Sequence, residues 1–183
     1  MKQAKNTFVP CGHVTVGDLT TQAGRFPQHR LGVKAIFFEP MKLEPQVLLG
    51  KLPAGYPHRF NLPGGGVDTG EDLATALLRE LFKEFGQFDL TIEQVKRSPV
   101  VAEGKLPFPR EGYQGKYEYL VAISFAGLHT LVPKDDAKIV LFQAMTWRRA
   151  AKTVWEDTRV ELDQRVLYAE AFEAVPRAAM LAA

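Results

Sequence analysis

The sequence predicts an α+β fold, an α/β/α sandwich in which strands flank one internal helix and one terminal helix. Five stretches rich in β-branched and aromatic residues are expected to be strands: residues 32–38, 46–51, 95–102, 117–125 and 139–147. One amphipathic helix is expected after the glycine-rich segment 64–66, and another over residues 164–175. Together these patterns indicate a single domain over residues 1–183, with residues 1–25 as an N-terminal arm or extra strand.

The elements follow in order. Glu39-Pro40 ends the strand over 32–38, and a short proline-containing turn leads to the strand over 46–51. Prolines and glycines are too dense between residues 53 and 66 for a helix, and a second loop of this kind covers residues 105–115. Trp147 and Trp155 are expected to pack in the core of the last strand and helix.

The internal helix has clear signals at both ends. Thr69, followed by Asp72, resembles an N-terminal capping pattern, and Gly86 is a natural stop. Between them, apolar residues recur every four positions, at Leu73, Leu77, Leu81 and Phe85. The remaining face is polar and carries Glu80 and Glu84 one turn apart, so both carboxylates project from one side.

The composition is that of an ordinary soluble globular protein. The chain has 183 residues and a formal charge of +2, which by itself does not indicate a nucleic-acid-binding protein. The single cysteine, Cys11, excludes an intramolecular disulfide and suits a reducing cytosol, so we expect a cytoplasmic protein. No membrane span or signal peptide is expected. The four histidines lack the spacing of zinc ligands.

Residues 65–87 resemble the Nudix box, a pattern of fixed offsets shared by a superfamily of hydrolases. The positions that match it are Gly65, Glu71, Arg79, Glu80, Leu81, Glu84 and Gly86. Two positions depart from it: Lys83 stands where a metal-ligating glutamate is usual, and Gln87 where an apolar residue is usual. The resemblance implies a Nudix-type α/β/α sandwich with a mixed sheet, a catalytic loop and helix, and a C-terminal helix.

The resemblance also implies roles for the box residues. Glu80 and Glu84 are expected to ligate one to three Mg²⁺ or Mn²⁺ ions, with the carbonyl of Gly64 or Gly65 completing the shell. Glu71 and Arg79 are expected to form the structural pair that holds the loop. Many members add an acid from a later loop. Asp136, beside Asp135, is the best candidate by location, with Glu118 and Glu111 behind it.

Lys83 has two interpretations. Its ammonium either replaces a metal between Glu80 and Glu84, which gives a nucleotide binder with little turnover, or contacts a substrate phosphate beside one or two remaining ions. We favour weakened but real hydrolysis, because Arg79, Glu80 and Glu84 are all retained.

The loops flanking the box suggest a nucleotide substrate, because they combine aromatic residues for a base with cations for phosphates. The candidate substrate-binding residues are Arg59, Phe60, Arg110, Tyr113, Lys116 and Tyr117. The segments 60–68 and 112–119 loosely resemble dinucleoside-polyphosphate hydrolases and RNA pyrophosphohydrolases.

The primary hypothesis is a Mg²⁺- or Mn²⁺-dependent hydrolase of a nucleoside diphosphate linked to another moiety. Its substrate would be a dinucleoside polyphosphate, a nucleotide sugar or the 5′ end of RNA. The alternative is a catalytically impaired module that binds nucleotide or RNA. Because many members of the superfamily are dimers, the resemblance also makes a homodimer one candidate oligomeric state.

Overall fold

A seven-stranded mixed sheet forms the centre of the structure, a computed structural model that describes residues 14–19, 28–39, 44–56, 59–86, 89–107, 112–135 and 137–182. Its main path runs β3 (Phe60–Asn61), β2 (Gln46–Lys51), β1 (His29–Glu39), β6 (Gly115–Ser124) and β5 (Val100–Leu106). In addition, β4 (Gly64–Gly66) pairs with β1, and β7 (Leu141–Thr146) pairs with β2. Only β1 and β6 run parallel among these pairs, so the sheet is mixed, as the resemblance implied.

Strand β1 lies at the middle of the sheet and is buried from Gly32 to Phe38. Successive side chains of a strand point to opposite faces. Accordingly, Val33, Ala35 and Phe37 belong to one hydrophobic cluster, and Ile36 and Phe38 to the other. The sheet therefore has a core on each face, which is the α/β/α arrangement expected from the sequence.

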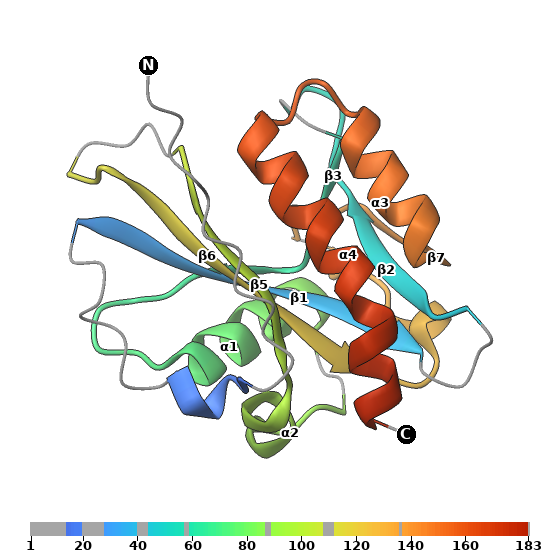
Figure 1. The fold of residues 1–183 in the computed structure, drawn as a ribbon, viewed down its shortest axis with the longest axis horizontal. Coiled ribbons are helices and arrows are strands. Elements are labelled where there is room, and N and C mark those ends of the chain that lie inside the picture. Colours follow the sequence, from blue (N-terminus) through green and yellow to red (C-terminus); the bar gives the residue numbers. More distant parts are fainter. Residues whose placement is uncertain are drawn as a thin grey trace.

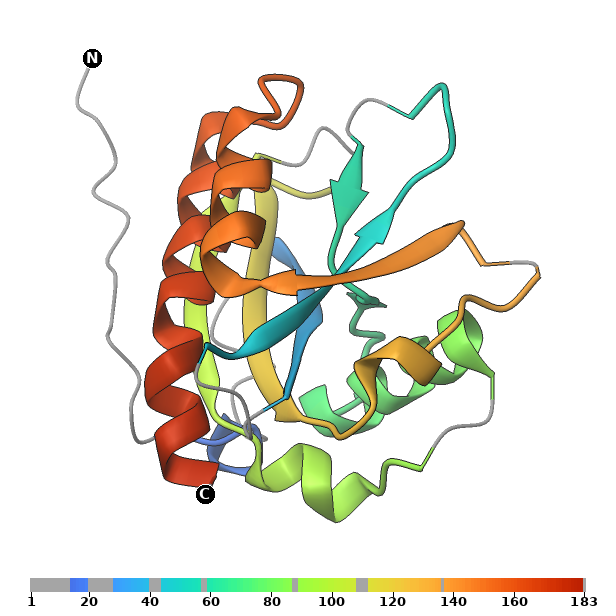
Figure 2. The same cartoon turned by 90° about the vertical axis from the view of Figure 1, so that its right-hand side faces the viewer.

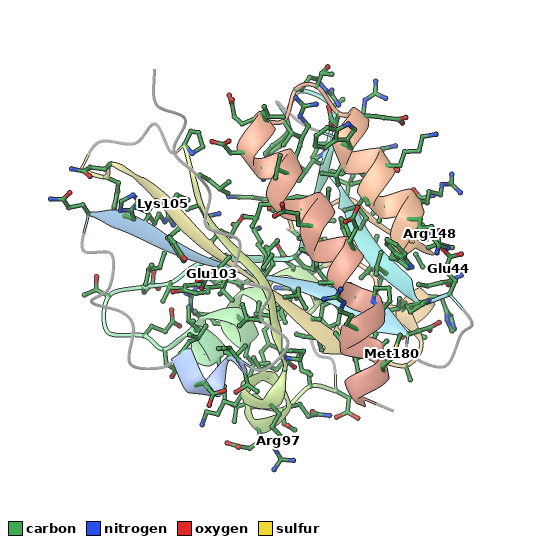
Figure 3. The ribbon with its side chains drawn as sticks, viewed as in Figure 1. Glu44, Arg97, Glu103, Lys105, Arg148 and Met180 are labelled. Atoms are coloured by element: carbon green, nitrogen blue, oxygen red, sulfur yellow. The ribbon has the colours of Figure 1, made fainter. Side chains whose placement is uncertain are left out.

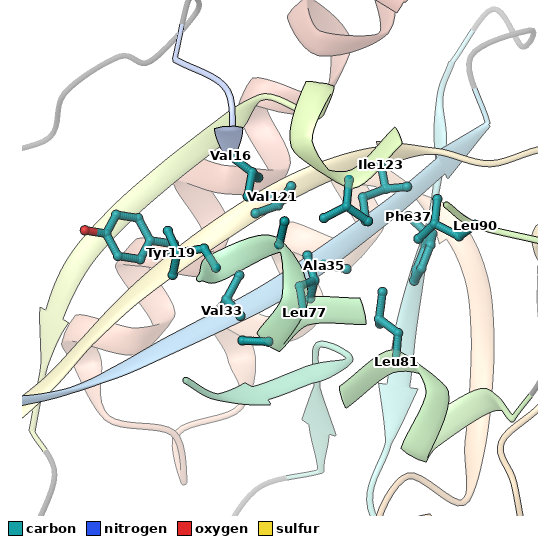
Figure 4. Close-up of a cluster of buried hydrophobic side chains, with 14 of the residues drawn as sticks. Val16, Val33, Ala35, Phe37, Leu77, Leu81, Leu90, Tyr119, Val121 and Ile123 are labelled. Atoms are coloured by element: carbon teal, nitrogen blue, oxygen red, sulfur yellow. The ribbon is translucent and has the colours of Figure 1, made fainter. Parts of the chain in front are cut away.

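Helix α1 (Leu73–Phe85) covers one face of the sheet. Figure 4 shows Leu77 and Leu81 of this helix beside Val33, Ala35 and Phe37 of β1. At its N-terminus the side chain of Asp72, one of the two residues of the predicted capping pattern, accepts hydrogen bonds from the N–H groups of Ala74 and Thr75. The N-cap residue is Asp72, not Thr69. Gly86 ends the helix as predicted, with a φ of 73°.

Helices α3 (Trp147–Glu156) and α4 (Leu162–Ala182) cover the opposite face, as Figures 1 and 2 show. Tyr168, Phe172 and Val175 of α4 are buried against this side of the sheet. Arg148 of α3 forms an exposed ion pair with Glu44 at 2.8 Å, and the two labelled side chains meet in Figure 3.

Several elements differ from the expectation. Residues 95–102 are not one strand, because α2 (Ile92–Arg97) precedes β5 and begins with a reciprocal capping box between Thr91 and Gln94. Helix α3 was missed, and it carries both tryptophans; Trp155 is 49% exposed and so is not a core residue.

Two short 3-10 helices, η1 (Gly17–Leu19) and η3 (Leu128–Thr130), complete the described elements. The predicted N-terminal arm lies mostly outside the described residues, although Thr15 bridges to Pro99. Within the described residues, no helix has the length and apolar character needed to cross a membrane.

Candidate active site

The glycine loop before α1 brings backbone close to the carboxylates of the helix. Gly64 has a φ of +123°, and a Cβ there would lie 2.4 Å from the carbonyl oxygen of Val33. A Cβ on Gly65 would lie 2.3 Å from Oε2 of Glu80. Glycine is therefore required at position 64, where φ is positive and the close atom belongs to the backbone, whereas a side chain at position 65 would displace the Glu80 carboxylate.

Arg79 and Glu71 form a bidentate pair that ties this loop to the helix. Arg79 Nε donates to Glu71 Oε1 at 2.8 Å and Nη2 donates to Glu71 Oε2 at 2.7 Å. Nη2 also donates to the carbonyl of Gly66 at 2.9 Å. The hydrogen bonds from Arg79 hold the pKa of Glu71 below its usual value, so the pair stays ionised at neutral pH.

Glu80 is held on one side by two cations. Its Oε1 accepts hydrogen bonds from Arg79 Nη1 and from Lys83 Nζ, the latter at 2.8 Å. Lys83 thus pairs with Glu80, and the hydrogen bonds of the described residues do not place it between Glu80 and Glu84. The Lys83 side chain is 59% exposed, so much of it remains in solvent.

Glu84 lies one turn after Glu80 on α1 and is partly buried. Its Oε2 accepts the N–H of Gly64 at 3.0 Å. Burial raises the pKa of Glu84 to about 7, although the charges of Lys34 and Lys138 and the Gly64 hydrogen bond oppose this shift. A nearby cation would stabilise the charged form of such a carboxylate and so lower its pKa.

Lys34 is a buried lysine that sequence analysis did not single out. It belongs to β1, is only 7% exposed, and donates from Nζ to the carbonyls of Leu62 at 3.0 Å and Gly64 at 2.8 Å. Burial lowers the pKa of Lys34, and the carboxylates of Glu118, Glu84 and Glu80 oppose that shift. The only signal in the sequence is a charged residue inside an otherwise apolar strand.

Glu118 of β6, one of the candidates for a further acid, is fully buried and paired within the fold. Its Oε1 accepts from Lys116 Nζ, and its Oε2 accepts from the Tyr168 hydroxyl at 3.1 Å. The Tyr168 oxygen also lies 3.4 Å from Asn61 Oδ1, which in turn accepts the N–H of Leu62. This network joins α4 to the segment that precedes the glycine loop.

Glu80 and Glu84 line a cavity of about 620 Å³ beside the glycine loop. Five cationic side chains and three acidic ones line it, and the exposed Tyr56 is its aromatic residue. The charged residues are Arg30, Lys34, Arg79, Lys83, Lys138, Asp68, Glu80 and Glu84. An excess of positive charge in a concave site suits a ligand that carries several negative charges.

The residues that the sequence predicted to bind substrate lie outside this cavity wherever the structure describes them. None of Arg59, Phe60, Tyr113, Lys116 and Tyr117, the described members of that set, lines this cavity. Tyr117 is buried in the hydrophobic cluster under α1, Phe60 packs on the opposite face, and Lys116 pairs with Glu118. Arg110, Glu111 and Asp136 lie outside the described residues.

The loop that contains Asp135 does reach the site. Lys134 N–H donates to the carbonyl of Glu84 at 2.7 Å, and Ala137, Lys138 and Ile139 line the cavity. Sequence reasoning missed Arg30 and Lys138 because only the folded chain brings them together with α1.

The donor set fits one hard divalent ion. Glu80 and Glu84 each use one oxygen in hydrogen bonds with the described residues, which leaves Glu80 Oε2 and Glu84 Oε1. Mg²⁺ is typically bound through one or two carboxylates, with water and substrate phosphates completing its shell. In the described part of the chain, no group of three or more His, Cys, Asp or Glu residues is suited to hold an ion.

Comparison with known proteins agrees with this geometry. The NUDIX domain model matches residues 28–169. An RNA pyrophosphohydrolase from Caulobacter vibrioides is 31% identical over 139 residues, covering 69% of this chain and 76% of the relative.

Solved structures are similar in fold. A mutT/nudix family protein from Listeria innocua has a TM-score of 0.53 at 18% identity, covering 84% of this chain and 97% of its own. The NUDIX domain of Shewanella oneidensis NrtR, complexed with ADP ribose, has a TM-score of 0.52 at 14% identity, covering 81% of this chain and 89% of that domain. With the family model matching most of its length around a cavity built on the box residues, the chain belongs to the Nudix family of hydrolases.

Proposed function

We propose that this Nudix hydrolase cleaves the diphosphate of a nucleoside diphosphate linked to another group, with Mg²⁺ or Mn²⁺ as cofactor. The observation that carries the proposal is the cavity itself, in which Glu80 and Glu84 face an excess of cationic side chains. A diphosphate with one divalent ion is complementary to such a site in both charge and chemistry.

A divalent ion is expected to be held by Glu80 and Glu84. When bound, it would neutralise phosphate charge and lower the pKa of the attacking water. The protein supplies the rest by positioning. Arg79 fixes Glu71 and the carbonyl of Gly66, so the loop and the two carboxylates keep one geometry.

The cations around the cavity are expected to bind the phosphates that flank the reaction. Arg30 lies over Gly66, where a Cβ would approach its Nη2 to 2.6 Å, and Lys138 lies on the opposing loop. Tyr56 is 41% exposed beside them and offers an aromatic face for a base. These residues replace the earlier set in Arg59, Phe60, Tyr113, Lys116 and Tyr117 as our candidates for substrate contact.

The 5′ end of RNA is the first substrate to test, because the Caulobacter relative is an RNA pyrophosphohydrolase. Dinucleoside polyphosphates and nucleotide sugars present the same diphosphate chemistry and belong in the same panel. Each would be offered with Mg²⁺ and separately with Mn²⁺, and Glu84→Gln would serve as the matched blank.

Turnover above that blank on any member, abolished by EDTA, is the expected result. A folded protein that binds nucleotide tightly in EDTA and hydrolyses nothing would overturn the proposal. The Lys83–Glu80 ion pair, which occupies an oxygen of a metal-binding carboxylate, would then explain a binding module instead.

A further inference from the structure

Two lysine side chains approach the carboxylate site, and the charges of Glu118, Glu84 and Glu80 favour the ammonium form of Lys34 against the effect of burial. Lys83 binds Glu80 Oε1 from solvent, and Lys34 reaches the same region from inside the sheet. Both contribute to the lining of the cavity, and only Lys34 is buried.

The Lys34 ammonium is held where a hard cation would find oxygen donors. Its two acceptors are backbone carbonyls of Leu62 and Gly64, at 3.0 and 2.8 Å. Glu84, which accepts the N–H of Gly64, faces the same short segment of backbone. The backbone oxygen of Gly64, one of those expected to complete a metal shell, therefore already has a cationic partner.

Because its stem is buried in β1, Lys34 cannot swing out to solvent as Lys83 can. A charge fixed in this way needs no reorganisation when the reaction develops negative charge on phosphate oxygens. Diphosphate cleavage in two-metal sites uses a second ion for this task.

We propose that the Lys34 ammonium takes the place of a second divalent ion, so that the site binds one ion on Glu80 and Glu84. This inference rests on the proposed function for its use in catalysis, but the number of ions bound is a property of the protein alone. Lys83 then weakens the binding of that ion without changing how many ions bind.

The test is a count of Mn²⁺ ions per chain by electron paramagnetic resonance, without substrate. The wild-type protein is expected to bind one ion. Lys83→Glu, which restores a carboxylate at an exposed position, is expected to bind one ion about tenfold more tightly. The double variant Lys34→Met/Lys83→Glu is expected to bind two.

Lys138→Met/Lys83→Glu is the matched control, because Lys138 lines the same cavity but is exposed and belongs to the opposing loop. It is expected to bind one ion. If it gains a second ion as the Lys34 variant does, simple loss of charge explains the result and the proposal is wrong.

Two or more ions in the wild-type protein or in Lys83→Glu would also contradict it, so the test stands even where Lys34→Met fails to fold. Failure of the hydrolysis panel leaves this count unchanged. The two proposals can therefore fail separately.

Discussion

At the scale of single residues, burial makes the ionised form of Glu84 costly in free energy. Burial raises its pKa to about 7, because the carboxylate loses water and, among the described residues, accepts one hydrogen bond, from the Gly64 N–H. The same cost makes the position receptive to a cation. The cation that we propose to bind here would offset this cost.

Glu84→Gln is expected to stabilise the metal-free protein at high pH. The carboxyl titrates near its ordinary pKa, about 4.3, when unfolded and at about 7 when folded. The folded state binds the proton more tightly, so wild-type stability falls as pH rises between these values. Above pH 8 the variant should be more stable by up to about 4 kcal/mol, and near pH 4 the difference should vanish.

Urea unfolding in EDTA at pH 5 and pH 8 measures the difference in unfolding free energy between Glu84→Gln and the wild-type protein. Glu93→Gln, at an exposed position on α2, serves as the control and should show little difference between the two. An equal gain for Glu84→Gln at both pH values would contradict the explanation.

Arg79 and Arg148 provide a matched comparison of two ion pairs. Arg79→Lys keeps the charge but loses the fork that holds both oxygens of Glu71, and it should destabilise the protein by about 1–3 kcal/mol. Arg148→Lys affects an exposed pair with Glu44, with the arginine side chain 70% exposed, and should cost less than about 0.5 kcal/mol. Equal losses in chemical denaturation would show that the geometry of the Arg79 pair carries no weight.

The sequence could place Glu71, Arg79, Glu80 and Glu84 close together because their positions depend on spacing along one loop and one helix. It could not identify Lys34, since a lysine in a strand is ordinarily an exposed residue and only the fold shows its ammonium on two carbonyls. Arg30 and Lys138 required the tertiary structure for the same reason.

At the scale of elements, the start of α1 depends on Asp72. Asp72→Ala should cost about 1 kcal/mol, because the N–H groups of Ala74 and Thr75 lose their acceptor. Thr69→Ala, three residues earlier, should cost less than about 0.5 kcal/mol, since Thr69 is exposed and does not cap the helix. Thermal unfolding of the two variants measures both losses, and a larger loss for Thr69→Ala would mean that Thr69, and not Asp72, caps the helix.

The misassigned stretch at residues 95–102 shows how a short helix escapes detection. Six residues are too few to display a helical period. The capping box of Thr91 and Gln94 was the available signal. By contrast, α1 was predicted well because its apolar period extends over three turns and Gly86 marks its end.

At the scale of the whole molecule, the two cores share one sheet, and each helical layer should therefore unfold with the other. Phe172→Ala on α4 and Leu77→Ala on α1 should each cost about 2–5 kcal/mol through the cavity that the substitution leaves. Both variants should keep a single transition in urea followed by fluorescence and by circular dichroism.

Trp155→Ala is the control for this experiment, because the side chain is 49% exposed on α3 and should contribute less than about 1 kcal/mol. Separate transitions for the two core variants would mean that the layers are independent units.

The layer order was predictable from the succession of strands and helices, whereas the strand order was not. Register is set by contacts between segments far apart in the sequence, such as His29 with Gly115 in the parallel pair of β1 and β6. Nothing local in the chain encodes that pairing.

The same pairing governs when the protein can fold. During synthesis β1 leaves the ribosome early, yet its longest partner, β6, follows only after α1, α2 and β5. Its neighbour β2 pairs with it over only two positions, Phe38 with Val47 and Glu39 with Gln46. The long apolar strand β1 therefore stays exposed in the nascent chain until β6 has been synthesised. We expect chaperones to bind β1 during this interval.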